Sequence, residues 1–192
     1  AEPPAGGAFA WTARKGEALV HLVGTVHAGI AGNLDRWPAE LEWCWQRTDG
    51  LLVEADTEDA AVISELIRKY GIASSADDTW GDRWTKELRD RVRRVVGDLP
   101  LEADRMRPWL LMQTVAVAHL VQQGLQPQQG LDARLIRRAR AEGRAITELE
   151  GAERQLRIFA DAPLDLQMAM LTDVLDDIES GEIGRASCRE RV

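Results

Sequence analysis

A short apolar stretch near the N-terminus, ALVHLVGTV at residues 18–26, constrains the fold more than any other part of the sequence. It is rich in Val and Leu, is bounded by Gly16 and Gly29, and is too short for a typical buried helix, so it predicts a buried strand. Gly24 removes a side chain where this strand ends, which lets another backbone or a ligand approach closely. We therefore expect His27 to lie at the carboxyl end of a buried strand.

A helix and a second strand follow this stretch. Residues 38–48 begin with proline and carry an apolar stripe, which predicts a short helix, and GLLVEA at residues 50–55 predicts a second buried strand that ends at Glu54. Strand, helix and strand form a right-handed crossover unit, whose two strands lie parallel. Ligands of open α/β sheets collect outside the carboxyl ends of parallel strands. His27 and Glu54 are therefore the centre of a candidate site.

The rest of the chain predicts an α/β (α+β) fold: a small mixed sheet with a large helical insertion, in one domain over residues 8–183. Residues 8–13 are expected to form an edge strand that enters the central strand through a hairpin, and residues 145–149 a third short strand. Helices are expected where apolar residues recur at helical spacing, over residues 58–70, 81–96, 107–123, 131–142, 152–160 and 163–179. The helix at 107–123 is the most apolar and is expected to be the most buried. The arginines of the helix at 131–142 are expected to form a solvated face.

The two ends of the sequence differ in composition from this domain. Residues 1–7, AEPPAGG, are rich in Pro and Gly and do not begin with Met, so we expect a flexible N-terminal segment left by signal cleavage or at a fragment edge. Residues 184–192, GRASCRERV, are positively charged and unpatterned. They are expected to be a non-native tail joined to a truncated reading frame.

Composition argues against several classes of function. The formal net charge of −8 argues against a nucleic-acid-binding surface. No window of 18 or more apolar residues occurs, which predicts no membrane span. The two cysteines, Cys44 and Cys188, do not imply a disulfide framework.

Five short motifs follow one another along the chain: Gly24-Thr25-Val26-His27, Leu52-Val53-Glu54-Ala55-Asp56, Met106-Arg107-Pro108-Trp109, Gly130-Leu131-Asp132, and Glu148-Leu149-Glu150 with Glu153 and Gln155 after it. In this order they resemble the landmarks of the TraB/GumN family, over residues 9–179. Relatives of that family include the TIKI metalloproteases, and the wider superfamily takes in erythromycin-esterase-like and ChaN-like proteins. The resemblance implies a divalent-metal hydrolase, most simply a peptidase, that acts on a peptide or small-molecule substrate. It also implies an exported protein, periplasmic or secreted.

One landmark of the family is absent from this sequence. Members that resemble enzymes carry a second GxxH motif in a C-terminal half, and neither His21 nor His119 has a glycine three residues before it. The resemblance therefore covers the N-terminal two-thirds of the family fold. The C-terminal part is expected to be missing and the chain by itself to be an inactive fragment.

The resemblance places His27 and Glu54 at the catalytic and metal-binding positions, and it selects Glu150 as a further metal ligand. Imidazole nitrogen and carboxylate oxygen together suit Mn, Co or Zn, and a hydrolytic site needs a few such ligands and an open position for water. Two arrangements are open. In the first, His27 and the two glutamates suffice. In the second, one carboxylate is a general base and a histidine of the second half completes the ligand set.

Two further residues have alternative roles. Arg107 either is catalytic, holding a substrate carboxylate or carbonyl, or is a structural residue before Pro108. Asp132 either orients a ligand histidine or caps its own helix. Two classes of function therefore remain: a metal-dependent hydrolase whose site this chain holds in part, and a non-catalytic binding or regulatory domain.

Overall fold

The computed structural model describes residues 10–30, 37–75, 78, 80–98 and 103–181. The chain divides into two compact units, each made of two stretches of sequence. Unit 1 contains residues 1–58 and 124–151, and unit 2 contains residues 59–123 and 152–192. The ranges 1–7 and 184–192, for which a flexible segment and a non-native tail are expected, lie outside the described residues.

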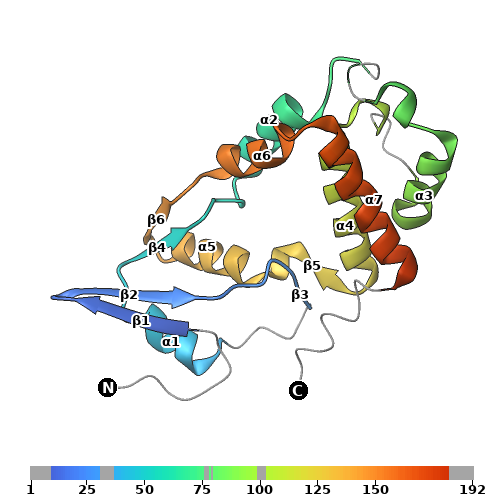
Figure 1. The fold of residues 1–192 in the computed structure, drawn as a ribbon. Helices are drawn as coiled ribbons and strands as arrows, with labels where there is room; N and C mark the ends of the chain where they lie inside the picture. The colour runs from blue at the N-terminus through green and yellow to red at the C-terminus, as the bar shows by residue number, and fades with distance from the viewer. Residues whose placement is uncertain (1–9, 31–36, 76–77, 79, 99–102, 182–192) are drawn as a thin grey trace. The chain divides into compact units, whose positions relative to one another are not determined.

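Unit 1 contains the strands of the described structure and two of its helices (Figure 1). Its elements, in chain order, are β1 (Ala10–Lys15), β2 (Ala18–Val23), β3 (Gly29–Ile30), α1 (Ala39–Trp45), β4 (Gly50–Val53), β5 (Leu125–Gln126), the 3₁₀ turn Pro127–Gln129, α5 (Leu131–Ala141) and β6 (Ala145–Glu148). The α/β fold class is confirmed.

The strands pair in three two-stranded sheets. β1 and β2 form the predicted antiparallel hairpin, β3 pairs antiparallel with β5, and β4 pairs parallel with β6. The hairpin and the presence of parallel strands are therefore confirmed, but the parallel pair forms between β4 and β6, whereas the predicted crossover unit placed it between residues 18–26 and 50–55. Among the described residues, however, these sheets are not joined into one mixed sheet, and β2 and β4 belong to different sheets. β2 is paired with β1, and β4 with β6, along their full lengths.

The β2 strand is covered on one face only. Leu19, His21 and Val23 are half-buried, and the His21 ring packs edge-on against the Trp43 ring at 5.4 Å. On the opposite face Leu22 is 56% exposed. The prediction of a buried strand over residues 18–26 is therefore wrong: the strand ends at Val23 with every second residue exposed, because a helix lies against only one face of the hairpin, and residues 24–26 are exposed as well.

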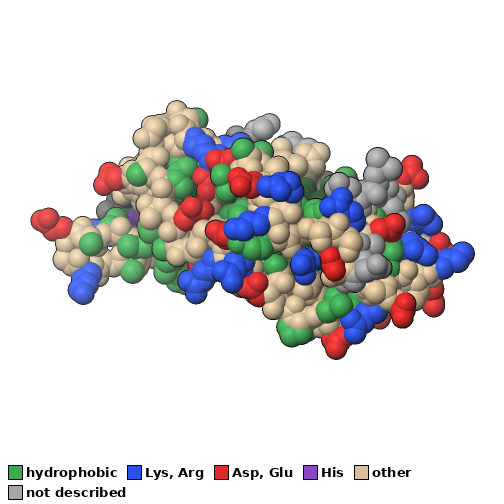
Figure 2. Space-filling model, turned by 90° about the horizontal axis from the view of Figure 1, so that it is seen from above, with side chains coloured by type: hydrophobic (Ala, Val, Ile, Leu, Met, Phe, Trp, Pro, Cys, Tyr) green, Lys and Arg blue, Asp and Glu red, His purple; other side chains and the backbone are tan. Residues whose placement is uncertain are grey.

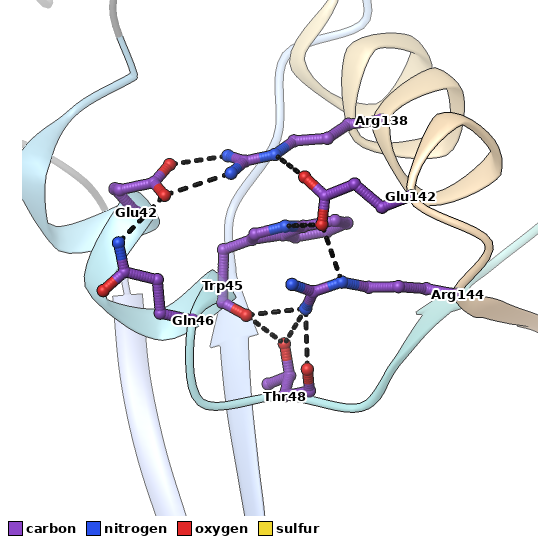
Figure 3. A network of polar contacts seen from close by, with 7 residues as sticks. All are labelled: Glu42, Trp45, Gln46, Thr48, Arg138, Glu142 and Arg144. Atoms are coloured by element: carbon purple, nitrogen blue, oxygen red, sulfur yellow. Dashed lines mark hydrogen bonds and ion pairs between the residues drawn. The ribbon is translucent and has the colours of Figure 1, made fainter.

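A network of arginine, tryptophan and glutamate side chains joins α1 to α5 (Figure 3). Arg138 donates to both carboxylate oxygens of Glu42, at 2.6 and 3.0 Å, and to Glu142 at 2.7 Å. Glu142 also accepts from Trp45 Nε1 and from Arg144 Nε, at 2.8 and 2.9 Å. The two guanidinium groups lie over the Trp45 ring, 4.8 and 4.2 Å from its centre. The hydrogen bonds from Arg138 hold the pKa of the Glu42 carboxyl below its usual range.

Unit 2 is helical. Its elements are α2 (Ala60–Gly71), the 3₁₀ turn Gly81–Arg83, α3 (Lys86–Val96), the 3₁₀ turn Ala103–Arg105, α4 (Pro108–Gln122), α6 (Ala152–Ala160) and α7 (Leu164–Ser180). The core forms where α4 packs against α7 and α3, and its fully buried side chains include Leu111, Val115, Leu171 and Leu175. The prediction that the helix at 107–123 is the most buried is confirmed. On the same helix, Val117 and Val121 are 42% and 54% exposed.

One buried polar side chain completes the core of unit 2. Gln167 is 3% exposed, and its Oε1 accepts a hydrogen bond from the backbone nitrogen of Trp109 at 3.4 Å. Its Nε2 donates to the carbonyl of Ala162 at 2.8 Å. The first turn of a helix leaves backbone N–H groups without a helical partner, and Gln167 supplies an acceptor for one such group of α4. Its burial is thus compensated by hydrogen bonds at both ends of the amide.

No helix among the described residues is long and apolar enough to cross a membrane. Figure 2 shows Lys and Arg side chains interspersed with Asp and Glu side chains over the face in view. Ion pairs among the described residues include Arg91 with Glu179 at 2.9 Å. On this face the negative charge of the chain is therefore mixed with positive charge.

Candidate functional site

His27 lies between β2 and β3. The residue before it, Val26, is hydrogen-bonded to the first residue of α5. The amide of Leu131 donates to the carbonyl of Val26 at 2.9 Å, and His27 Nδ1 lies 3.0 Å from Asp132 Oδ2. The His27 side chain is 81% exposed, whereas the Asp132 side chain is 24% exposed. Since an ionised carboxylate can only accept, Nδ1 carries the hydrogen and donates a hydrogen bond to Asp132.

Gly130 allows this arrangement because a larger residue would collide with His27. A Cβ atom built on Gly130 would lie 2.7 Å from the carbonyl carbon and 2.8 Å from the carbonyl oxygen of His27, and 2.9 Å from Asp132 Oδ1. The backbone of Gly130 has φ −57° and ψ 149°, which any residue adopts. The glycine is therefore needed for space and not for its conformational freedom.

Asp132 does not cap its helix. The N-cap position of α5 is Gly130, no side chain caps this end of the helix, and Asp132 follows in the first turn. Its carboxylate faces His27 instead. A histidine whose Nδ1–H is held by a carboxylate presents the lone pair of Nε2 outward, which is the usual arrangement of a metal-ligating or proton-accepting imidazole. Within the described residues, nothing donates a hydrogen bond to His27 Nε2.

Glu54 and Glu150 lie at the carboxyl ends of the parallel strands β4 and β6. The strands are in register from Gly50 with Ala145 to Val53 with Glu148. Beyond them, the amides of Glu150 and Gly151 both donate to the carbonyl of Glu54 at 3.0 Å. The third predicted strand thus brings the backbones of the two glutamates together, and both residues are exposed.

The acidic segment that follows Glu54 is held in place by α5. Arg140 pairs with Asp56 at 2.5 Å, and Arg137 pairs with Glu58 at 2.8 Å. The amide of Asp56 also donates to Glu148 at 2.7 Å. Arg137 and Arg140 are exposed, as predicted for a solvated face, but both are ion-paired. Acidic groups from segments distant in the sequence fold back onto the helix and neutralise these arginines.

Arg107 belongs to unit 2, whereas the other four candidate residues belong to unit 1. It is the N-cap residue of α4, and its amide donates to the carbonyl of Gly71 at 2.7 Å, where α2 ends. A Cβ on Gly71 would collide with Leu110 and contact Trp109. The backbone of Arg107 thus joins two helices of unit 2, and a catalytic role of its side chain stays a prediction.

The chemistry of the described donors fits part of a metal site. His27 supplies an imidazole oriented by Asp132, and Glu54 and Glu150 supply carboxylates. Nevertheless, the part of the chain that the structure describes contains no group of three or more His, Cys, Asp or Glu residues placed to hold a metal ion. The described residues alone therefore do not form a complete metal site.

Several residues that build this region were not selected from the sequence: Asp56, Glu58, Gly130, Arg137 and Arg140. One signal was available, since Gly130 stands beside Asp132 in a motif and a glycine before a helix often marks a close backbone approach. The ion pairs gave no comparable signal, because their partners are 79 to 84 residues apart.

Comparison with known proteins agrees with the order of the motifs. A family model described as the TraB/PrgY/gumN family matches residues 9–186. The chain is 23% identical over 155 residues to "Uncharacterized protein YbaP" of Escherichia coli (strain K12) and to the protein of that name from Shigella flexneri. The match covers 81% of this chain and 56% of each relative, so the chain spans about half the length of these curated relatives. No solved structure matches the chain.

Proposed function

Because the chain belongs to the TraB/PrgY/gumN family, we propose that it is part of a divalent-metal-dependent hydrolase that acts on peptides. His27 is one metal ligand in this proposal, Glu54 and Glu150 are the acidic residues of the site, and Asp132 orients His27. A bound divalent metal would polarise the scissile carbonyl and lower the pKa of a bound water. The proposal includes an exported location for the protein.

The observation that supports this proposal is the pairing of His27 with Asp132. An exposed histidine gains little by being fixed unless its free nitrogen has a function. Here the carbonyl of the preceding residue, Val26, accepts from Leu131, and the His27 ring is held by Asp132. The carboxylate keeps the proton on Nδ1 and so keeps Nε2 available. The same geometry serves metal binding and proton transfer.

Titration calorimetry with Mn²⁺, Co²⁺ and Zn²⁺ tests the proposal. The chain is expected to bind one of these ions weakly and without turnover, because incomplete ligand sets lose affinity but keep part of it. His27→Ala is expected to abolish this binding, and His119→Ala, in unit 2, is the control. Equal affinity in wild type and His27→Ala would refute the role of His27.

A second candidate is a non-catalytic binding or regulatory domain of the same family. The absence of a group of three metal-binding side chains among the described residues favours it. Peptide hydrolysis assayed with each metal, on this chain and on a chain of the full length of the relatives, separates the two candidates. Metal-dependent cleavage by the longer chain supports the hydrolase, and its absence together with the absence of metal binding supports the binding domain.

A further inference from the structure

The guanidinium group of Arg137 connects two segments that are far apart in the sequence. Its Nη2 donates to the backbone carbonyl of Gln128 at 2.5 Å, and its Nη1 donates to the carboxylate of Glu58 at 2.8 Å. The Glu58 side chain is 20% exposed and that of Arg137 is 42% exposed, so the pair is partly sheltered from water. Each segment leads directly to one part of the candidate site.

The segment at Gln128 leads to His27. Gln128 lies in the 3₁₀ turn Pro127–Gln129, and the amide of Gly130 donates back to the carbonyl of Pro127 at 2.9 Å. Gly130 then packs against the His27 carbonyl, and Leu131 and Asp132 bond to the Val26 carbonyl and the His27 ring. A displacement of this turn therefore moves every group that holds His27.

The segment at Glu58 leads to Glu54. The amide of Glu58 donates to Asp56 Oδ1 at 3.1 Å, and the amide of Asp56 donates to Glu148 Oε1 at 2.7 Å. Glu54, two residues earlier, accepts from the amides of Glu150 and Gly151. A series of contacts thus links the segment that carries Glu54 to Arg137, and Asp56 within it also pairs with Arg140.

We propose that Arg137 is a positioning residue, which fixes the segment holding His27 relative to the segment carrying Glu54. The inference rests on the proposed function for its purpose, but its geometry is independent of any bound metal. Arginine suits this task because its planar guanidinium presents several donors in fixed directions, so one side chain can hold two acceptors at once. Lysine carries the same charge on a flexible stem and does not reproduce that arrangement.

Backbone amide exchange measured by NMR on the whole chain tests the proposal. Arg137→Gln is expected to speed exchange of the Leu131 amide and of the Asp56 amide together, by about two- to fivefold, the range for a half-exposed ion pair. The neutral His27 ring is also expected to lose part of its Nδ1–H tautomer, which imidazole ¹⁵N spectra report. Arg137→Lys is expected to restore neither the slow exchange of the two amides nor the Nδ1–H tautomer of His27.

Arg138→Lys is the matched control, since it alters the next residue of the same helix. Arg138 binds Glu42 and Glu142 but neither of the two segments. This variant is expected to speed exchange in α1, for example at the Gln46 amide, and to leave Leu131 and Asp56 unchanged. Glu58→Gln combined with Arg137→Gln is expected to affect Asp56 no more than Arg137→Gln alone, because both variants break the same contact.

Two results would overturn the proposal: wild-type exchange at Leu131 and Asp56 in Arg137→Gln, or the same increases at both amides in Arg138→Lys. The second result would show a loss of overall stability instead of a local connection. These readouts need no metal. If the wild-type chain binds no metal but Arg137→Gln still loosens both amides, the proposed function fails and the positioning role stands.

Discussion

Replacing Gly130 with alanine tests how His27 is held in place. The added methyl group would lie 2.7 and 2.8 Å from the carbonyl carbon and oxygen of His27, distances that real Cβ atoms do not tolerate. Because these neighbours are backbone atoms, no side chain can rotate away to make room. The turn before α5 must therefore move away from His27.

The magnitude follows from three contributions. Steric overpacking costs about 1–3 kcal/mol. Loss of the hydrogen bond from Leu131 to Val26 costs about 1 kcal/mol. Alanine at a compatible backbone conformation stabilises by about 0.4–1 kcal/mol, because it restricts the unfolded chain. The free energy of unfolding is expected to fall by about 2 kcal/mol, which lowers Tm by about 4–8 °C for a chain of this size.

The assay combines urea unfolding with imidazole ¹⁵N spectra, and Gly143→Ala is the matched control. Gly143 has φ +68° and open space around its Cβ position, so alanine there is expected to cost a similar amount, about 1–2 kcal/mol, through backbone strain alone. Both variants should lose stability, but only Gly130→Ala should release the His27 Nδ1–H. A Gly130→Ala protein with wild-type stability and an unchanged His27 tautomer would refute the reasoning.

Three further predictions concern other parts of the chain. Leu111→Asp, at a position with no exposed surface, is expected to lower the free energy of unfolding by more than about 4 kcal/mol and to prevent folding of unit 2. Val117→Asp, at a position on the same helix that is 42% exposed, should be tolerated. Circular dichroism during urea unfolding compares the two variants. Burial, and then the charge of Arg47, hold the pKa of His21 below its ordinary value of 6.5. The folded protein therefore binds a proton at His21 less readily than the unfolded chain, and stability is expected to fall as the pH drops below about 6.5. His21→Gln should make stability less dependent on pH in this range. An unchanged pH dependence would exclude His21 as its cause. Glu54→Gln is expected to weaken metal binding at least about tenfold without altering the melting curve, with Glu65→Gln as the control, and equal affinities by calorimetry would remove Glu54 from the site.

Local patterns predicted most helices of the fold closely, although the helix expected over residues 81–96 begins only at Lys86, after the 3₁₀ turn Gly81–Arg83. The helix over residues 152–160 was predicted to the residue, and the helices around residues 107–123 and 131–142 within one residue at each end. These segments carry their own periodicity and boundary residues, so sequence alone was sufficient. The pairing of strands was predicted less well, because a strand of four residues such as β4 does not encode which neighbour it joins.

The candidate site was also predicted only in part. His27, Glu54 and Asp132 stand out in the sequence by their motifs and by their positions at element ends. The residues that hold them were hidden, because an arginine such as Arg137 looks like a solvated residue until its partner, 79 residues away, is known. Ion pairs between distant residues leave no local pattern in the sequence. The residues that position the site are therefore seen only in the folded structure.

The division of each unit between two stretches of sequence also constrains how the chain folds during synthesis. β4 is translated about 90 residues before β6, its parallel partner, and closing a loop of that length costs about 4 kcal/mol in chain entropy. Of the helices translated in between, α2, α3 and α4 belong to unit 2, which itself waits for α6 and α7. A ribosome that has just translated residue 123 therefore carries neither unit in complete form.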